Sequence, residues 1–274
     1  MTSAAQAAAL GLEHVTCAFA ARGGQGRYIA VRDTSLAVGA GEFVSVVGPT
    51  GCGKSTLLNV AAGLLTPSSG HALVHGVPLS GINARAGYMF QSDALMPWRS
   101  TLDNVTVGLE FHGTAKTDAV PKAREWLARV GLAGFEDRYP HQLSGGMRKR
   151  VALAQMLILD PEILLMDEPF SALDIQTRQL MENELLALWA EKKKAVLFIT
   201  HDLDEAIAMS DRVVCLSAGP ASHPIGEFAI DLPRPRDVAE VRMHPRFVEL
   251  HTQIWNVLRD EVLKGYAQQL KKAA

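Results

Sequence analysis

A glycine-rich turn between a strand and a helix limits what this chain can fold into. The turn reads Gly48-Pro-Thr-Gly-Cys-Gly-Lys-Ser-Thr56 and matches the pattern G-x-x-x-x-G-K-[ST]. A β-branched apolar run at 42–47 precedes the turn, and a helical pattern at 54–64 follows it. A chance match in a glycine-rich turn is the alternative, and the flanking strand and helix argue against it because they are the context that the motif requires.

The residue types in this turn suit a nucleotide phosphate. Glycines let the backbone curl until successive amide hydrogens point inward, and the following helix adds its partial positive charge. Lys54 supplies a charge for the β- and γ-phosphates, and the Ser55 hydroxyl is a ligand for Mg²⁺. The predicted phosphate site comprises Gly48, Pro49, Thr50, Gly51, Cys52, Gly53, Lys54, Ser55 and Thr56.

Two carboxylates end a second apolar run. Asp167 and Glu168 follow residues 163–166, and in a doubly wound sheet ligands bind at the carboxyl ends of strands. We expect Asp167 to hold the magnesium ion and Glu168 to polarise the attacking water. The alternative is an acidic strand-to-turn junction, which the phosphate loop makes the weaker interpretation.

A histidine and a glutamine complete the predicted catalytic set. His201 follows the apolar run 196–200, and alone it would be interpreted as a structural cap beside Asp202 and Glu205. With the other motifs present, we expect His201 to sense the γ-phosphate and to orient water and Glu168. Gln91 has an amide oxygen that can reach Mg²⁺ and the attacking water, although a glutamine without the other motifs would not indicate a catalytic site.

A serine-glycine turn precedes a helix with several basic residues. The turn reads Leu143-Ser-Gly-Gly-Met147, in which Ser144 is a good N-cap and the glycines expose backbone amides. This pattern predicts a second anion site. An ordinary capped helix is the alternative, and the five residues alone do not exclude it.

The apolar pattern predicts an α/β fold. The runs at 162–166 and 195–200 are each followed by a helix, which indicates a mostly parallel sheet covered on both faces. Residues 12–20 and 28–38 alternate like antiparallel strands around the turn at 22–26. The middle third, 91–158, is mostly helical and looks inserted into the sheet.

Composition and charge exclude several functions. The 274 residues carry a formal net charge of −2, which argues against nucleic acid as the main partner. We find no apolar run of the roughly eighteen residues that a spanning helix needs. The cysteines are interpreted as reduced thiols in a cytosolic compartment. We therefore expect any contact with a membrane to go through a protein partner or the surface.

Residues 12–220 resemble the ATPase subunits of ABC transporters. The resemblance matches 48–56 to the phosphate loop, Gln91 to the Q-loop, 143–147 to the signature motif and 163–167 to the Walker B strand. It also matches Glu168 to the catalytic glutamate, 171–174 to the D-loop and His201 to the switch histidine. Phe19, or less favourably Tyr28, corresponds to the aromatic residue that stacks on adenine. The signature departs from the family pattern at Met147, where glutamine is usual, and methionine is familiar among importers of anions and small organic acids.

The resemblance implies a fold and a division of the chain. It implies a P-loop NTPase core with a mostly parallel sheet, an N-terminal antiparallel β subdomain and an inserted α-helical subdomain. Residues 1–11 would form a flexible tail and 12–222 the ATPase domain. Within that domain the core would be 12–90 and 159–222, and the helical subdomain 91–158. Residues 223–274 would form a short helical extension.

The resemblance also implies cofactors and partners. Two subunits would enclose two ATP molecules and Mg²⁺, which Ser55, Gln91 and Asp167 would bind. Each nucleotide would lie between one phosphate loop and the other chain's Ser144, Gly145, Gly146 and Asp174. A homodimer is expected, and a heterodimer with a paralogue is the alternative.

Residues 91–105 and 231–236 resemble importers for nitrate, sulfonates, taurine and related small organic molecules. The resemblance implies a peripheral protein at the cytoplasmic face of the bacterial inner membrane, with permease subunits docking near Gln91–Val105. A periplasmic solute-binding protein would act indirectly. Leu95, Met96 and Trp98 are expected to form an apolar docking pocket, or alternatively to pack only the core of their own subdomain. The competing functions are the ATPase of an exporter or lipid-handling complex and a soluble ABC protein. The soluble ABC protein is disfavoured by a single cassette without a heptad run.

Overall fold

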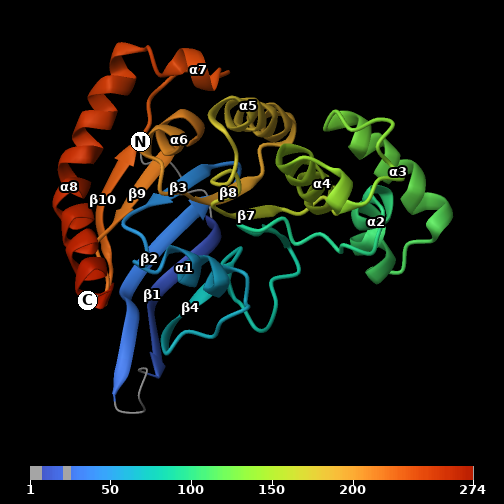
Figure 1. Cartoon of the computed structure of the whole chain (residues 1–274). Coiled ribbons are helices and arrows are strands. Elements are labelled where there is room, and N and C mark those ends of the chain that lie inside the picture. The colour runs from blue at the N-terminus through green and yellow to red at the C-terminus, as the bar shows by residue number, and fades with distance from the viewer. Residues whose placement is uncertain (1–7, 21–25, 274) are drawn as a thin grey trace, which may run out of the picture.

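The computed structural model describes residues 8–20 and 26–273, which form two sheets and the helices around them (Figure 1). The larger sheet has the order β10-β9-β3-β8-β7-β6, and all of its strands except β10 run parallel. Its strands are β3 (Phe43–Val47), β6 (Ala86–Met89), β7 (Ile163–Asp167), β8 (Ala195–Ile199), β9 (Arg212–Leu216) and β10 (Pro224–Ala229). The predicted α/β core with a mostly parallel sheet is confirmed.

The smaller sheet is antiparallel and has the order β2-β1-β4-β5. Its strands are β1 (Ala8–Ala20), β2 (Arg27–Gly39), β4 (Ser69–Val74) and β5 (Val77–Pro78). The predicted pairing of β1 with β2 is confirmed, while most of the predicted turn at 22–26 lies outside the described residues. The predicted tail at 1–11 is too long. Residues 8–11 belong to β1 because Leu10 pairs with both Val38 and Val74 and is buried, and residues 1–7 lie outside the description.

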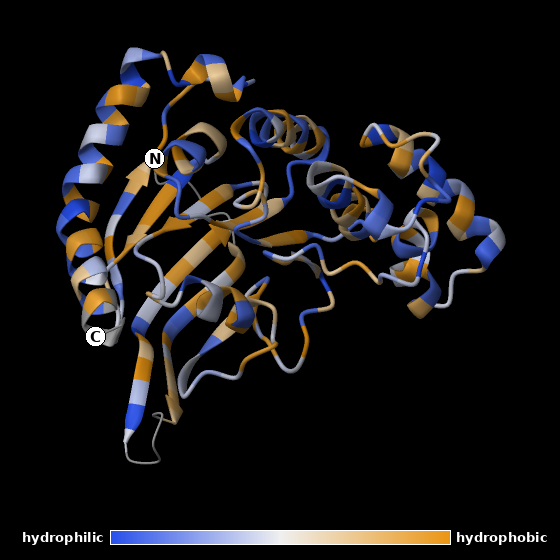
Figure 2. Cartoon of the chain, viewed as in Figure 1, coloured by the Kyte–Doolittle hydropathy of each residue, from blue (hydrophilic) through white to orange (hydrophobic). Residues whose placement is uncertain are grey.

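Each face of the parallel sheet has its own apolar core, which explains the continuous apolar runs in the sequence. Along β8, Val196 and Phe198 face the helices α4 to α8, whereas Leu197 and Ile199 face α1 and the small sheet. Figure 2 shows the resulting apolar strands in the middle of the molecule. The helices of the sheet are α1 (Lys54–Ala61), α5 (Ile175–Lys192), α6 (Leu203–Met209), α7 (Val238–Val241) and α8 (Pro245–Ala273).

The insertion between β6 and β7 is a separate helical subdomain (Figure 1). It consists of α2 (Thr101–Phe111), α3 (Lys116–Arg129), a 3₁₀ turn (Pro140–Gln142) and α4 (Gly145–Leu157). These helices share a third apolar core. Ser100 caps α2 by accepting a hydrogen bond from the amide of Asp103.

The C-terminal segment is not only helical, which corrects the predicted extension at 223–274. Residues 224–229 form β10, which pairs antiparallel with β9 and extends the parallel sheet. The six residues of β10 are half-buried or exposed, so their sequence lacks the apolar run that marked the inner strands. Helix α8 then packs its apolar side, including Phe247 and Ile254, on the same core.

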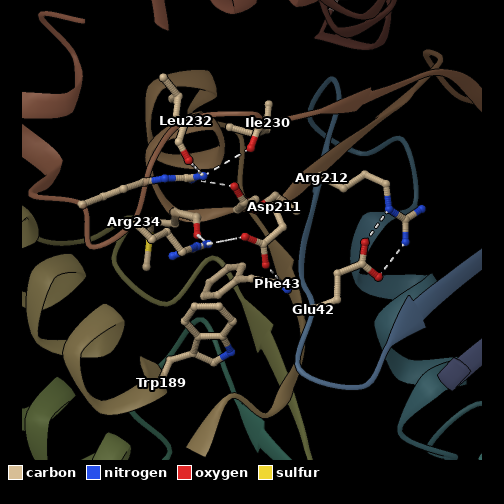
Figure 3. A network of polar contacts seen from close by, with 12 residues as sticks. Glu42, Phe43, Trp189, Asp211, Arg212, Ile230, Leu232 and Arg234 are labelled. Atoms are coloured by element: carbon tan, nitrogen blue, oxygen red, sulfur yellow. Dashed lines mark hydrogen bonds and ion pairs between the residues drawn. The ribbon is translucent and has the colours of Figure 1, made fainter. Parts of the chain in front are cut away.

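Two arginines of the segment 231–236 hold the C-terminal end of helix α6 in place, and Figure 3 labels Arg234 with its partner Asp211. Arg234 donates hydrogen bonds to Asp211 and to the carbonyl of Met209, and its guanidinium lies 4.3 Å from the ring centre of Trp189. Arg236 is buried and donates to backbone carbonyls at the end of α6 and before α7. Its acceptors are the carbonyls of Ile207, Ala208, Ser210, Ile230, Leu232 and Pro233.

A carboxyl pair is buried between α5 and α6. Glu182 is fully buried, and within the described part of the chain neither of its carboxyl oxygens has a hydrogen-bond partner, while Glu205 is 4% exposed. Burial raises the pKa of Glu182 to about 7 and also raises that of Glu205, against the opposing effect of Arg178 and, at Glu182, of Arg242. Because a raised pKa favours the protonated carboxyl in the folded state, this state binds more protons than the unfolded chain between pH 4.5 and about 7.

This pair predicts a pH-dependent stability. The free energy of unfolding should fall as the pH rises from 5 to 8, because burial opposes the ionisation of Glu182. Glu182→Gln should remove about 2 kcal/mol of this fall in urea titrations at the two pH values. Glu191→Gln, at an exposed carboxylate on the same helix, should keep the wild-type pH dependence. An unchanged pH dependence in Glu182→Gln would contradict the assignment.

Candidate functional site

The phosphate loop leaves the carboxyl end of β3 and leads into α1. Gly51 and Gly53 have φ angles of 77° and 100°, which side chains other than glycine adopt with strain. A Cβ on Gly53 would also lie 2.5 Å from Cγ1 of Val31. Both the backbone angle and the close packing against β2 therefore require glycine at position 53.

The lysine of this loop lies inside the site. Lys54 is 5% exposed, and its ammonium donates to the carbonyls of Gly48 at 2.8 Å and Pro49 at 3.2 Å. The same nitrogen lies 4.0 Å from a carboxylate oxygen of Glu168. The ammonium of Lys54 is thus held at the phosphate loop and faces Glu168, which follows β7.

Helix α8 also packs against the phosphate loop, because a Cβ added to Gly265 would lie 2.9 Å from Pro49.

Ser55 and Asp167 face each other across the site. The Ser55 hydroxyl donates to a carboxylate oxygen of Asp167 at 3.0 Å. Burial raises the pKa of Asp167, and the hydrogen bond from Ser55 and the charge of Lys54 only partly oppose this. A hydroxyl and a carboxylate are the oxygen ligands that Mg²⁺ accepts, and a cation here would favour the ionised form of Asp167.

Glu168 is the centre of the site. Its backbone has a φ of 43°, a left-handed conformation that is unusual for residues other than glycine, and its amide donates to the carbonyl of Ile199. One carboxylate oxygen accepts a hydrogen bond from Nε2 of Gln91 at 3.3 Å and lies 3.0 Å from Nδ1 of His201. The structure therefore brings together Lys54, Ser55, Gln91, Asp167, Glu168 and His201 from the ends of β3, β6, β7 and β8.

The remaining predicted residues form a second cluster where α4 meets α5. Ser144 caps α4 by accepting a hydrogen bond from the amide of Met147, and a Cβ on Gly146 would lie 2.7 Å from Thr177. Asp174 caps α5 by accepting a hydrogen bond from the amide of Thr177, which holds the pKa of Asp174 below its ordinary value. Helix α5 begins after Asp174, and the Ser171 hydroxyl donates to the carbonyl of Glu168.

The sequence did not reveal how helix α4 is joined to the loop that carries Gln91. Lys149 of α4 is 2% exposed and donates to the carbonyl of Gln91 at 2.6 Å. Asp93 accepts a hydrogen bond from Arg148 at 2.7 Å and lies 3.3 Å from the Lys149 ammonium. In the sequence, Lys149 is one of three consecutive basic residues, and nothing there distinguishes it from a solvent-exposed lysine.

The two candidate aromatic residues share a face of the β1–β2 hairpin. Phe19 and Tyr28 are directly paired across the strands, and they are 41% and 38% exposed. The Tyr28 hydroxyl lies 3.7 Å from the position of a Cβ built on Gly219, and the carbonyl of Gly51 lies 3.4 Å from the same position. Tyr28 thus lies beside the phosphate loop, while adenine stacking by Phe19 stays a prediction.

A family model described as ABC transporter matches residues 31–171. The chain belongs to this family. An uncharacterised ABC transporter ATP-binding protein of Methanocaldococcus jannaschii is 49% identical over 257 residues, which cover 93% of each chain. The predicted family resemblance is confirmed, and this chain is an ATP-binding and ATP-hydrolysing cassette.

Other relatives carry transport names. A taurine import ATP-binding protein of Yersinia pestis is 47% identical over 70% of this chain and 75% of its own length. A nitrate import ATP-binding protein of Synechococcus elongatus is 40% identical over 92% of this chain and 38% of its own length. Among solved structures, the dimeric post-hydrolysis state of the ATP-binding cassette MJ0796 bound to ADP and Pi matches with a TM-score of 0.72. It is 30% identical and covers 82% of this chain and 100% of its own.

The phosphate loop predicts the effect of removing the lysine. Lys54→Ala should weaken ATP binding by at least about tenfold, because the loop then loses the positive charge that faces the β- and γ-phosphates. Calorimetric titration with ATP measures this loss. Lys264→Ala, at an exposed lysine of α8, is the control and should bind ATP normally. Undiminished affinity in Lys54→Ala would refute the assignment of the phosphate loop.

Proposed function

We propose that this chain is the ATPase subunit of an importer for a small organic or inorganic anion. The observation that carries the proposal is the identity of 47% and 40% to taurine and nitrate import ATP-binding proteins. The resemblance of residues 91–105 and 231–236 to importers for nitrate, sulfonates and taurine supports the same subgroup of ATPases. Nitrate, a sulfonate and taurine are the solutes that this proposal favours.

In the proposed mechanism, Glu168 polarises the attacking water. His201 and Gln91, which both contact one Glu168 oxygen, orient this carboxylate and the water. Lys54 and the loop amides bind the β- and γ-phosphates. Residues Ser55, Asp167 and Gln91 would hold Mg²⁺. The facing oxygens of Ser55 and Asp167 are of the type that this ion binds. When bound, the ion would neutralise the negative charge that develops on the phosphate.

A second subunit completes the proposed site. Ser144, Gly145 and Gly146 expose amides at the start of α4, where they would bind the γ-phosphate held by the other chain. Asp174 would lie at the same interface, and a homodimer is proposed. The dimeric arrangement of the MJ0796 cassette supports this pairing. Since the γ-phosphate would hold the two chains together, hydrolysis would loosen the dimer.

Permease subunits are proposed to dock near Gln91–Val105. A groove beside this segment runs between β6 and the helical subdomain, and its lining includes Phe90, Gly108 and Met156. Trp98 is 73% exposed and is available to a partner. Leu95 and Met96 are half-buried, and Leu95 packs against two apolar cores of the chain. Of the three residues expected to form the docking pocket, we therefore propose only Trp98 as a contact for the permease.

The membrane would be reached through those permeases. Among the described residues, no helix combines the length and the apolar character that crossing a bilayer requires. We propose a peripheral position at the cytoplasmic face of the inner membrane, with a periplasmic solute-binding protein supplying the solute. An exporter or lipid-handling ATPase is the alternative, and the names of the relatives disfavour it.

Affinity purification of the tagged chain from its native membranes tests the proposal. Mass spectrometry should identify a multi-spanning permease and a solute-binding protein in the eluate. Trp98→Asp should lose the permease and keep basal ATP turnover within about twofold, because it places a charge on the docking surface alone. Phe111→Asp, at an exposed residue at the end of α2, should retain the permease. Only soluble partners with the wild-type chain would refute the importer.

A further inference from the structure

The position of His201 depends on the first turn of helix α6. Asp202 follows His201 and caps this helix, since its carboxylate accepts hydrogen bonds from the amides of Asp204 at 2.9 Å and Glu205 at 3.2 Å. The backbone of Asp202 is itself fixed, because its amide donates to the Thr200 hydroxyl. A displacement of the α6 N-terminus therefore displaces the imidazole that contacts Glu168.

One arginine of α5 joins this turn to the loop 171–174. Arg178 donates through Nη1 to Asp202 at 3.2 Å. Through Nη2 it donates to the carbonyls of Leu173 at 3.2 Å and Ser171 at 3.5 Å. The two nitrogens of one planar guanidinium thus bind two loops that are about thirty residues apart in the chain, and a lysine ammonium cannot reproduce this fork.

The loop that Arg178 binds is connected to both clusters of the site. Its hydroxyl at Ser171 donates to the carbonyl of Glu168, and its last residue, Asp174, caps α5 next to Gly146. Arg178 therefore lies between the predicted contact with a second subunit and the histidine beside Glu168.

Further contacts hold α6 along its length. The carboxyl pair Glu182 and Glu205 packs α6 against α5 beside Arg178. At the other end of α6, the buried Arg236 binds the carbonyls of Ile207, Ala208 and Ser210. Charged hydrogen bonds therefore hold both ends of α6, from Arg178 at Asp202 and from Arg236 at the C-terminal carbonyls.

We propose that Arg178 is a positioning residue that couples the loop 171–174 to His201. When a second subunit contacts Asp174, Arg178 holds Asp202, and with it His201, in the place where the imidazole supports Glu168. This inference rests on the proposed roles of His201 and of the loop 171–174. It adds a residue that links the subunit interface to the catalytic centre.

Steady-state kinetics of the purified chain test this coupling. Arg178→Gln should lower kcat at least about tenfold, because misplacing a catalytic group by a fraction of an ångström has effects of this size. ATP affinity measured by calorimetry should stay within about twofold, since Arg178 does not touch the phosphate loop. Arg178→Lys should recover part of kcat through its single charge. Arg129→Lys, at an arginine that pairs α3 with the far end of α5, should match the wild type.

A double-mutant cycle shows whether Arg178 acts through Asp202. Asp202→Asn keeps a good N-cap for α6 and removes the charge that Arg178 binds. The double variant Arg178→Gln/Asp202→Asn should lose no more kcat than the more severe single variant. Losses that multiply, or a kcat of Arg178→Gln within about twofold of the wild type, would overturn the proposal.

His201→Ala separates this inference from the proposed function. If His201→Ala retains wild-type turnover, the role proposed for His201 fails, and the coupling fails with it. If His201→Ala abolishes turnover while Arg178→Gln turns over normally, only the coupling through Arg178 is refuted. A lowered melting temperature with unchanged kcat in Arg178→Gln would show a structural role and would also refute it.

Discussion

The carboxylate of Glu168 is the point at which the structure converges. Lys54, Gln91 and His201 come from the ends of three other strands, and each has an atom within 4.0 Å of this carboxylate. A parallel sheet brings the carboxyl ends of these strands to one edge. Because β6, β7 and β8 are neighbours in the sheet, the residues that follow β6 and β8 can both contact Glu168 at the end of β7. The fold therefore serves chiefly to assemble one cluster of charged and polar groups around a strained residue.

Long-range contacts keep the parts around this cluster in place. Lys149 fastens α4 to the carbonyl of Gln91, so the start of the insertion is held beside the catalytic carboxylate. Arg234 and Arg236 fasten α6 on the opposite side, which gives the segment 231–236 a structural role within the chain. Each of these cations donates to backbone carbonyls, and Lys149 and Arg236 are buried, so their loss would leave buried carbonyls without partners.

The sequence allowed the strands β1, β2, β3, β7 and β8, the phosphate loop and most of the catalytic cluster to be predicted because each has a local pattern. The run 163–166 is continuously apolar since it is buried on both faces, and Gly53 is marked by its motif. Strand β10 has no such pattern, because only its pairing with β9 makes it a strand. Lys149 and Arg178 were missed for a similar reason. Their side chains bind residues 58 and 24 positions away, which no local spacing reveals.

The role of Glu168 is tested most directly by Glu168→Gln, which keeps the shape of the side chain and removes its charge. The measurement combines ATP turnover with the molecular mass of the protein in ATP and Mg²⁺. The account predicts that turnover falls at least about a hundredfold, that ATP still binds, and that the protein becomes a stable dimer. Wild-type turnover by Glu168→Gln would contradict the assignment of Glu168 as the catalytic base.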